Sequence, residues 1–113
     1  MDFHDEKPIY LQIADVFCES ILSGKLQGDA RIPSVREYGA DIGVNPNTVM
    51  RVYEKLTADG IIYNKRGIGY FVSADAREKI LQGQRKDFLE KEVPAILRRL
   101  DLLGLDINVF NRA

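Results

Sequence analysis

The sequence contains one cysteine, one histidine, no tryptophan and no long run of apolar residues. A single cysteine, Cys18, cannot form an internal disulfide framework, so we expect a fold held by its core in a reducing, cytoplasmic environment. A structural zinc site needs clustered cysteine and histidine ligands, and His4 stands apart from Cys18, so no metal site is expected. The absence of an apolar run of about 18 residues argues against a membrane span. The acidic first residues also lack the apolar segment of a signal peptide.

Patterns of catalytic residues are missing as well. The chain shows no Ser/His/Asp arrangement, no glycine-rich phosphate loop and no convergent pair of carboxylates. We therefore expect neither an enzyme nor a bound cofactor.

An excess of positive charge, the usual feature of a DNA-binding domain, is also absent. The chain has 16 Lys and Arg against 17 Asp and Glu, a net charge of −1. Residues 1–75 carry 8 basic and 11 acidic residues, whereas residues 76–113 carry 8 and 6. Any affinity for DNA would therefore come from a few locally placed cations and would fall steeply with salt.

Apolar residues recur at helical spacing directly after the N-terminal segment. Pro8 suits the first turn of a helix, and the periodic apolar positions then run from Ile9 to Ile21. Gly24 predicts the end of this helix, and residues 28–31 are predicted to form a loop.

The stretch from Ile32 to Tyr53 contains two helix starts of different chemistry. Ser34 and Glu37 have the spacing of a capping box, which predicts a short helix that ends at a glycine turn. Asn45 is the expected cap of the next helix, with Pro46 at its first position. A short helix, a tight turn and a second helix with polar residues at its tip form the helix-turn-helix that reads DNA.

The second of these helices has two distinct faces. Residues expected to pack inward recur at core spacing: Val49, Val52, Tyr53 and Leu56. The opposite face carries Asn47, Arg51 and Lys55. This separation predicts an amphipathic recognition helix whose polar face remains available to a partner.

A hairpin pattern follows this helix. Residues 61–65 and 70–73 are rich in β-branched and aromatic side chains and flank a turn that contains Gly67 and Gly69. A hairpin directly after a recognition helix is a wing. The predicted fold is therefore mainly α with a small β-hairpin, a winged helix-turn-helix DNA-binding domain over residues 1–74.

Residues 75–113 are predicted to be a C-terminal helical dimerisation segment. An apolar stripe follows the spacing of a short coiled coil: Leu89, Val93, Ile96, Leu100 and Leu103. Such a stripe is too large to remain in water, so it packs either on a second copy or on the winged domain of its own chain. Pro94 lies inside the stripe and either kinks the helix or divides it.

Several segments with fixed spacing together match a known pattern: PIYLQI at residues 8–13, Gly24-x-Leu26-x-x-Gly28, IPSVRE at 32–37, IGVNPNTVMRVYEKL at 42–56, Gly60, and RGIGYFV at 66–72. In these segments the chain resembles the GntR family of transcriptional regulators, and in particular its YtrA-like branch. The resemblance implies a bacterial repressor that binds a palindromic, double-stranded DNA operator as a homodimer.

The chain departs from the family pattern at Tyr38-Gly39 and at Met50, with a milder change at Val52, where Ala is common. Tyr38-Gly39 replaces the usual Leu-Ala, and a glycine inside a helix costs about 1 kcal/mol relative to alanine. We therefore expect this helix to lie unusually close to a neighbour. Met50 stands where many members have an arginine, and it is either an exposed helix residue or a contact to a thymine methyl group.

The candidate DNA-contacting residues lie on the two helices of the motif. Asn45, Asn47 and Thr48 are expected at the tip that enters the major groove, where an Asn can pair with adenine. Arg51, one turn further on, is the candidate for a base contact, and the resemblance also implies a DNA-contacting residue at Arg36. Without DNA, the same residues would be ordinary caps and first-turn or surface side chains.

The wing tip supplies the remaining candidates. Lys65, Arg66 and Gly67 would lie along the minor groove, where Gly67 permits a close approach and Arg66 suits the negative potential. Alternatively, these charges only keep the exposed hairpin turn soluble and contact no DNA.

Two rival functions remain beside DNA binding. The acidic charge balance would suit a winged-helix module for protein–protein assembly. The chain could also be a metabolite sensor with a secondary DNA role. A small-molecule effector would have to bind between subunits, because the segment after the wing is too short to enclose a pocket.

Overall fold

The structure is a computed structural model, and it describes residues 7–112. His4 and the acidic first residues lie outside this range. The chain forms two compact units, one ending at Ile80 and the other beginning at Leu81. Between residues 7 and 112, no helix is long and apolar enough to cross a membrane. No group of three or more His, Cys, Asp or Glu side chains in that range is arranged to hold a metal ion.

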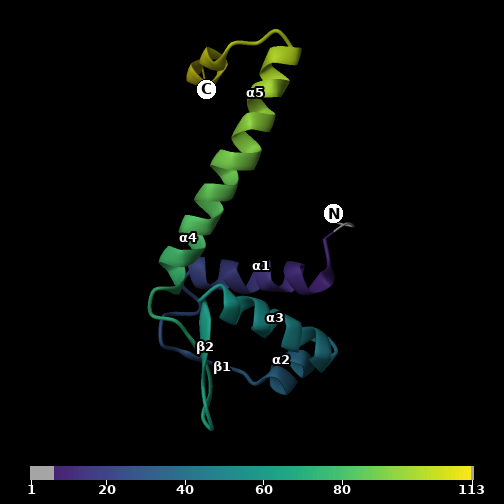
Figure 1. The fold of residues 1–113 in the computed structure, drawn as a ribbon, viewed down its shortest axis with the longest axis vertical. Coiled ribbons are helices and arrows are strands. Elements are labelled where there is room, and N and C mark those ends of the chain that lie inside the picture. The colour runs from purple at the N-terminus through teal and green to yellow at the C-terminus, as the bar shows by residue number, and fades with distance from the viewer. Residues whose placement is uncertain (1–6, 113) are drawn as a thin grey trace. The chain divides into compact units, whose positions relative to one another are not determined.

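The first unit contains three helices, a small sheet and the start of a fourth helix (Figure 1). Helix α3 (Pro46–Ala58) packs against both α1 (Ile9–Leu22) and α2 (Val35–Ile42). The four expected inward residues of α3 are all buried, which confirms its predicted core face. The core also draws on α1, on the sheet and on the first turns of α4 (Ala76–Asp87). Its buried residues are Ala14, Phe17, Ile21, Ile32, Val49, Val52, Tyr53, Leu56, Ile61, Ile62, Val72, Ala76 and Ile80.

The predicted helix caps are present in the structure. The Glu37 N–H donates to Ser34 Oγ at 3.1 Å, and the Ser34 N–H donates to Glu37 Oε1 at 2.9 Å, which completes the capping box. At the start of α3, Asn45 Oδ1 accepts from the Asn47 N–H at 2.7 Å. Gly43 ends α2 in the left-handed conformation, with φ of 70°. These local bonds determine where the two helices of the motif begin and where the first one ends.

The close approach of the Val44 carbonyl explains why α2 has a glycine at position 39. Gly39 is buried, and a Cβ placed on it would lie 2.7 Å from the carbonyl oxygen of Val44. The Val44 N–H donates to the Gly39 carbonyl at 2.9 Å, so the turn folds tightly back on the helix. The expected close neighbour is therefore the backbone of the α2–α3 turn itself.

The sheet has three antiparallel strands in the order β1-β3-β2. The predicted hairpin is confirmed as β2 (Ile62–Lys65) and β3 (Gly69–Val72). The short strand β1 (Arg31–Ile32) pairs with β3 and places Arg31 opposite Phe71. The loop prediction for residues 28–31 is therefore wrong at Arg31, because a two-residue strand is too short to show an alternating pattern.

Helix α4 (Ala76–Asp87) begins in the first unit and continues beyond Ile80. A π-helical turn (Phe88–Glu92) leads into α5 (Val93–Leu102), and a 3₁₀ segment (Ile107–Arg112) follows. Pro94 lies in the first turn of α5, where it has no N–H to donate to the preceding turn. A wider helical turn therefore precedes the proline, and the chain passes from α4 to α5 without an intervening loop.

Candidate DNA-binding surface

The N-terminal end of α3 presents polar side chains at the surface. Asn45 and Asn47 are exposed, and Thr48 is half-buried in the first turn. Asn45 uses its side-chain oxygen to cap the helix, which leaves its NH₂ group as a donor for a partner. Capping and DNA contact are therefore compatible at this position.

Arg51 lies one turn beyond this tip and contacts another helix. Its guanidinium carbon is 4.1 Å from the centre of the Tyr10 ring, a cation–π contact between α3 and α1. Arg51 is exposed, whereas Tyr10 is half-buried at the second position of α1. Sequence reasoning missed Tyr10, because no local pattern links two residues that meet only when the helices pack.

Arg36 is exposed at the second position of α2, inside the capping box between Ser34 and Glu37. Within residues 7–112, neither Arg36 nor Arg51 forms an ion pair. Both guanidinium groups therefore remain free to attract an anionic partner such as a phosphate.

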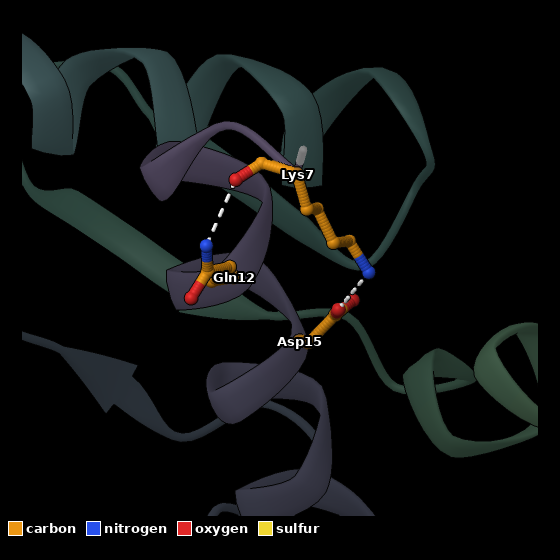
Figure 2. Close-up of polar contacts among 3 residues, drawn as sticks. All are labelled: Lys7, Gln12 and Asp15. Atoms are coloured by element: carbon orange, nitrogen blue, oxygen red, sulfur yellow. Dashed lines mark hydrogen bonds and ion pairs between the residues drawn. The ribbon is translucent and has the colours of Figure 1, made fainter. Parts of the chain in front are cut away.

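The lysines nearby behave differently. Lys55 Nζ lies 3.0 Å from Asp59 on the same helix, and the hydrogen bond from Lys55 to Asp59 raises the pKa of this lysine. Figure 2 shows Lys7, just before α1, paired with Asp15, while its carbonyl accepts from Gln12 Nε2 at 2.8 Å. These ion pairs leave less of the charge of Lys7 and Lys55 for a partner. At the wing, Lys65 is exposed and lies over the Phe71 ring at 5.0 Å, and it forms no ion pair within residues 7–112.

The wing tip is an open, exposed turn. Gly67 has φ of 79°, and no atom lies within 4 Å of the position that a Cβ would occupy. Arg66 beside it is exposed. The Ile68 N–H donates to the Lys65 carbonyl at 2.8 Å and closes the turn. An arginine held at such a tip suits the approach to a groove of DNA.

Arg31 supports the wing from the neighbouring strand. Its Nη2 donates to the Ile68 carbonyl at 2.8 Å. Its side chain also covers Gly69, since a Cβ there would lie 3.2 Å from Arg31 Nε. Sequence reasoning missed this residue together with strand β1. The structure thus adds two residues that contact the predicted elements: Tyr10 contacts Arg51, and Arg31 bonds to the wing turn.

The sites predicted from the sequence fall into two groups within the first unit. Arg36, Asn45, Asn47, Thr48 and Arg51 lie on α2 and α3. Arg66 and Gly67 lie at the tip of the β2–β3 hairpin, which extends away from α1 and α3 in Figure 1. Together these are the elements with which a winged helix-turn-helix contacts a major groove and its flank.

Comparison with known proteins gives the family of this fold. The profile described as "Bacterial regulatory proteins, gntR family" matches residues 9–72. The HTH-type transcriptional regulator YhcF of Bacillus subtilis is 39% identical over 105 residues, which cover 91% of this chain and 84% of that protein. The HTH-type transcriptional repressor YtrA of Bacillus subtilis is 37% identical over 84 residues, 74% of this chain and 65% of that protein.

A solved structure agrees with both relatives. The crystal structure of a GntR-family transcriptional regulator from Bacteroides thetaiotaomicron has a TM-score of 0.82 and 47% sequence identity, and the match covers 93% of this chain and 91% of that chain. The predicted fold class and the resemblance to YtrA-like proteins are confirmed by these matches. The chain therefore belongs to the gntR family of bacterial regulatory proteins.

Proposed function

We propose that this protein is a transcriptional repressor that binds a palindromic DNA operator as a homodimer. The observation that carries the proposal is the set of exposed arginines beside the polar tip of α3 and at the wing, none of which forms an ion pair within residues 7–112. The family, and relatives named as transcriptional repressors, support regulation of transcription through DNA. The same surface argues against the rival role in protein–protein assembly. Cations placed around a helix that fits the major groove suit contacts to phosphates and base edges.

The operator is found by selecting bound duplexes from a random DNA library with the purified protein at two salt concentrations. Recovery of an inverted repeat is the expected result, and its spacing would give the dimer geometry. Recovery of no motif, with weak binding that is lost at moderate salt, would contradict the proposal and favour the protein-assembly role.

Arginine and lysine variants of α3 then test the surface itself. Arg51→Ala is expected to weaken binding to the selected duplex by about 5- to 150-fold, since a specific contact of this kind is worth about 1–3 kcal/mol. Lys55→Ala is the matched control, because it removes one positive charge from the same helix at a side chain already paired with Asp59. If Arg51→Ala weakens binding no more than the control does, Arg51 does not contact the DNA.

Arg36→Ala tests the α2 side of the motif in the same assay. We expect a loss of similar size at Arg36 if it touches a base, or a uniform loss across sequences with a smaller salt dependence if it touches a phosphate. Unchanged DNA binding by both arginine variants would contradict the proposed DNA-binding surface on α2 and α3.

The homodimer is proposed to form through the second unit. Most of its large apolar side chains are exposed, with Leu102 at 84% and Leu89 at 64%, whereas Val93 and Leu100 of the predicted stripe are half-buried. The full set of exposed apolar residues from α5 and its flanks is Phe88, Leu89, Ile96, Leu97, Leu102, Leu103, Leu105, Ile107 and Phe110. Monomeric proteins rarely expose so much contiguous apolar surface, so a second copy is the partner we propose.

Sedimentation or light scattering of the full chain measures the assembly directly. Wild-type protein is expected as a dimer, and Leu89→Lys is expected to shift it toward monomer. Glu90→Lys, a neighbouring exposed position outside the apolar stripe, is the matched control and should stay dimeric. A wild-type monomer at concentrations well above those used for DNA binding would contradict the dimer.

A further inference from the structure

The contact between Tyr10 and Arg51 joins the start of α1 to the recognition helix. The guanidinium carbon stands 4.1 Å from the ring centre, well inside the range of about 6 Å over which a cation is attracted to an aromatic face. Because α1 and α3 pack directly on each other, the ring belongs to a fixed framework. Tyr10 itself is half-buried and contacts the core of the unit.

A stacked guanidinium keeps its hydrogen-bonding capacity. The Arg51 guanidinium lies over the Tyr10 ring, and this contact pairs none of its five N–H donors with an oxygen acceptor. An ion pair would instead occupy those donors, as the Lys55 ammonium group is occupied by Asp59. The stacked arrangement therefore orders Arg51 without consuming the donors that a base edge or a phosphate would need.

Arg51 also has an acidic neighbour that it does not bind. Glu54 lies three positions further along α3, a spacing at which Arg and Glu side chains often pair on a helix. No ion pair joins them among the residues that the structure describes. The Tyr10 ring offers the guanidinium an alternative position on the α1 side of the helix.

We propose that Tyr10 is a positioning residue for DNA recognition, one that holds the Arg51 guanidinium by its face and leaves its N–H edges free for DNA. This inference rests on the proposed function. Ordering a long side chain before binding reduces the entropy lost when DNA binds, which increases affinity. The effect acts through Arg51, so it should disappear when Arg51 is absent.

A double-mutant cycle on the selected duplex tests this dependence. Tyr10→Leu removes the ring and is expected to weaken binding about three- to fivefold, the size of an exposed cation–π contact. Tyr10→Phe keeps the ring and should bind within about twofold of wild type by the same estimate. In an Arg51→Ala background, Tyr10→Leu should have no further effect. An equal loss in both backgrounds, or no loss in either, would overturn the positioning role.

Measurements on the free protein separate this inference from the proposed function. A ring current from Tyr10 should shift the NMR signal of the Arg51 side-chain Nε–H in wild type and Tyr10→Phe, but not in Tyr10→Leu. Thermal unfolding of each variant checks that it is folded. If the wild type binds no duplex, the proposed function fails and the recognition role falls with it. DNA binding without the ring-current shift would overturn the positioning role alone.

Discussion

The glycine inside α2 gives the sharpest test of how tightly the helix-turn-helix is built. Replacing Gly39 by alanine should increase helix propensity by about 1 kcal/mol. The added Cβ would lie 2.7 Å from the Val44 carbonyl oxygen, closer than real Cβ contacts, so something has to move. The obstructing atom belongs to the backbone, and Val44 is tied to Gly39 by its own N–H bond of 2.9 Å.

The two opposing contributions can be compared directly. Overpacking a tight site costs about 1–3 kcal/mol, so a cost near 2 kcal/mol exceeds the gain in propensity. We expect Gly39→Ala to lower the free energy of unfolding by about 1 kcal/mol. The movement that relieves the clash would also shift α3 relative to α2. Operator affinity should therefore fall under conditions where the variant remains fully folded.

Gly83 is the matched control, because it too lies inside a helix. Apart from the backbone of its own helix and its chain neighbours, nothing lies within 4 Å of the Cβ position there, so only the propensity gain applies. Gly83→Ala should raise the free energy of unfolding by up to about 1 kcal/mol. Urea unfolding followed by circular dichroism compares both variants with wild type at one protein concentration. Equal stabilisation by the two substitutions would show that the α2–α3 turn yields freely, and the reasoning would fail.

Three further predictions concern single side chains of the first unit. The Tyr53 hydroxyl donates to the Pro33 carbonyl at 2.7 Å, so Tyr53→Phe should cost about 1 kcal/mol in urea unfolding, and an unchanged midpoint would contradict this. Hydrogen bonds from the Ser34 N–H and hydroxyl lower the pKa of Glu37. The stabilisation by this carboxylate is therefore present above its ordinary pKa and is lost as pH falls through the lowered value. An NMR titration should show the pKa of Glu37 rising toward normal in Ser34→Ala. Burial raises the pKa of Cys18 to about 11, so alkylation of the native thiol should increase only toward that pH, whereas a midpoint near the usual value of about 8.5 would contradict its burial.

The helix boundaries of the motif could be predicted because their signals are local. Ser34 and Glu37 are three residues apart, and the bond that closes the Asn45 cap spans two residues. The buried face of α3 was equally accessible, since its apolar residues repeat within one helix. Strand β1 was missed because its two residues form a strand only through their partners on β3.

The sequence motif identified the candidate DNA-contacting residues, but it could not predict which side chains lie next to them. The α2 and α3 candidates are exposed, apart from the half-buried Thr48, and their contact with DNA stays a prediction. The ring under Arg51 and the Arg31 bond to the wing turn depend on packing between distant segments. A sequence pattern reports neighbours along the chain, whereas these contacts depend on the assembled fold.

The net charge of the whole sequence, −1, is a poor guide to the charge on the candidate DNA-binding surface. Lys55 and Lys79 each lie four residues from an aspartate and pair with it, at 3.0 Å and 3.5 Å. Such exposed pairs add little stability, but they set the acidic residues beside lysines. Arg36 and Arg51 remain without such partners within residues 7–112. Because affinity for a phosphate depends on charges within about a Debye length, roughly 10 Å at about 0.1 M salt, the arginines at the contact matter more than a net charge counted over the whole chain.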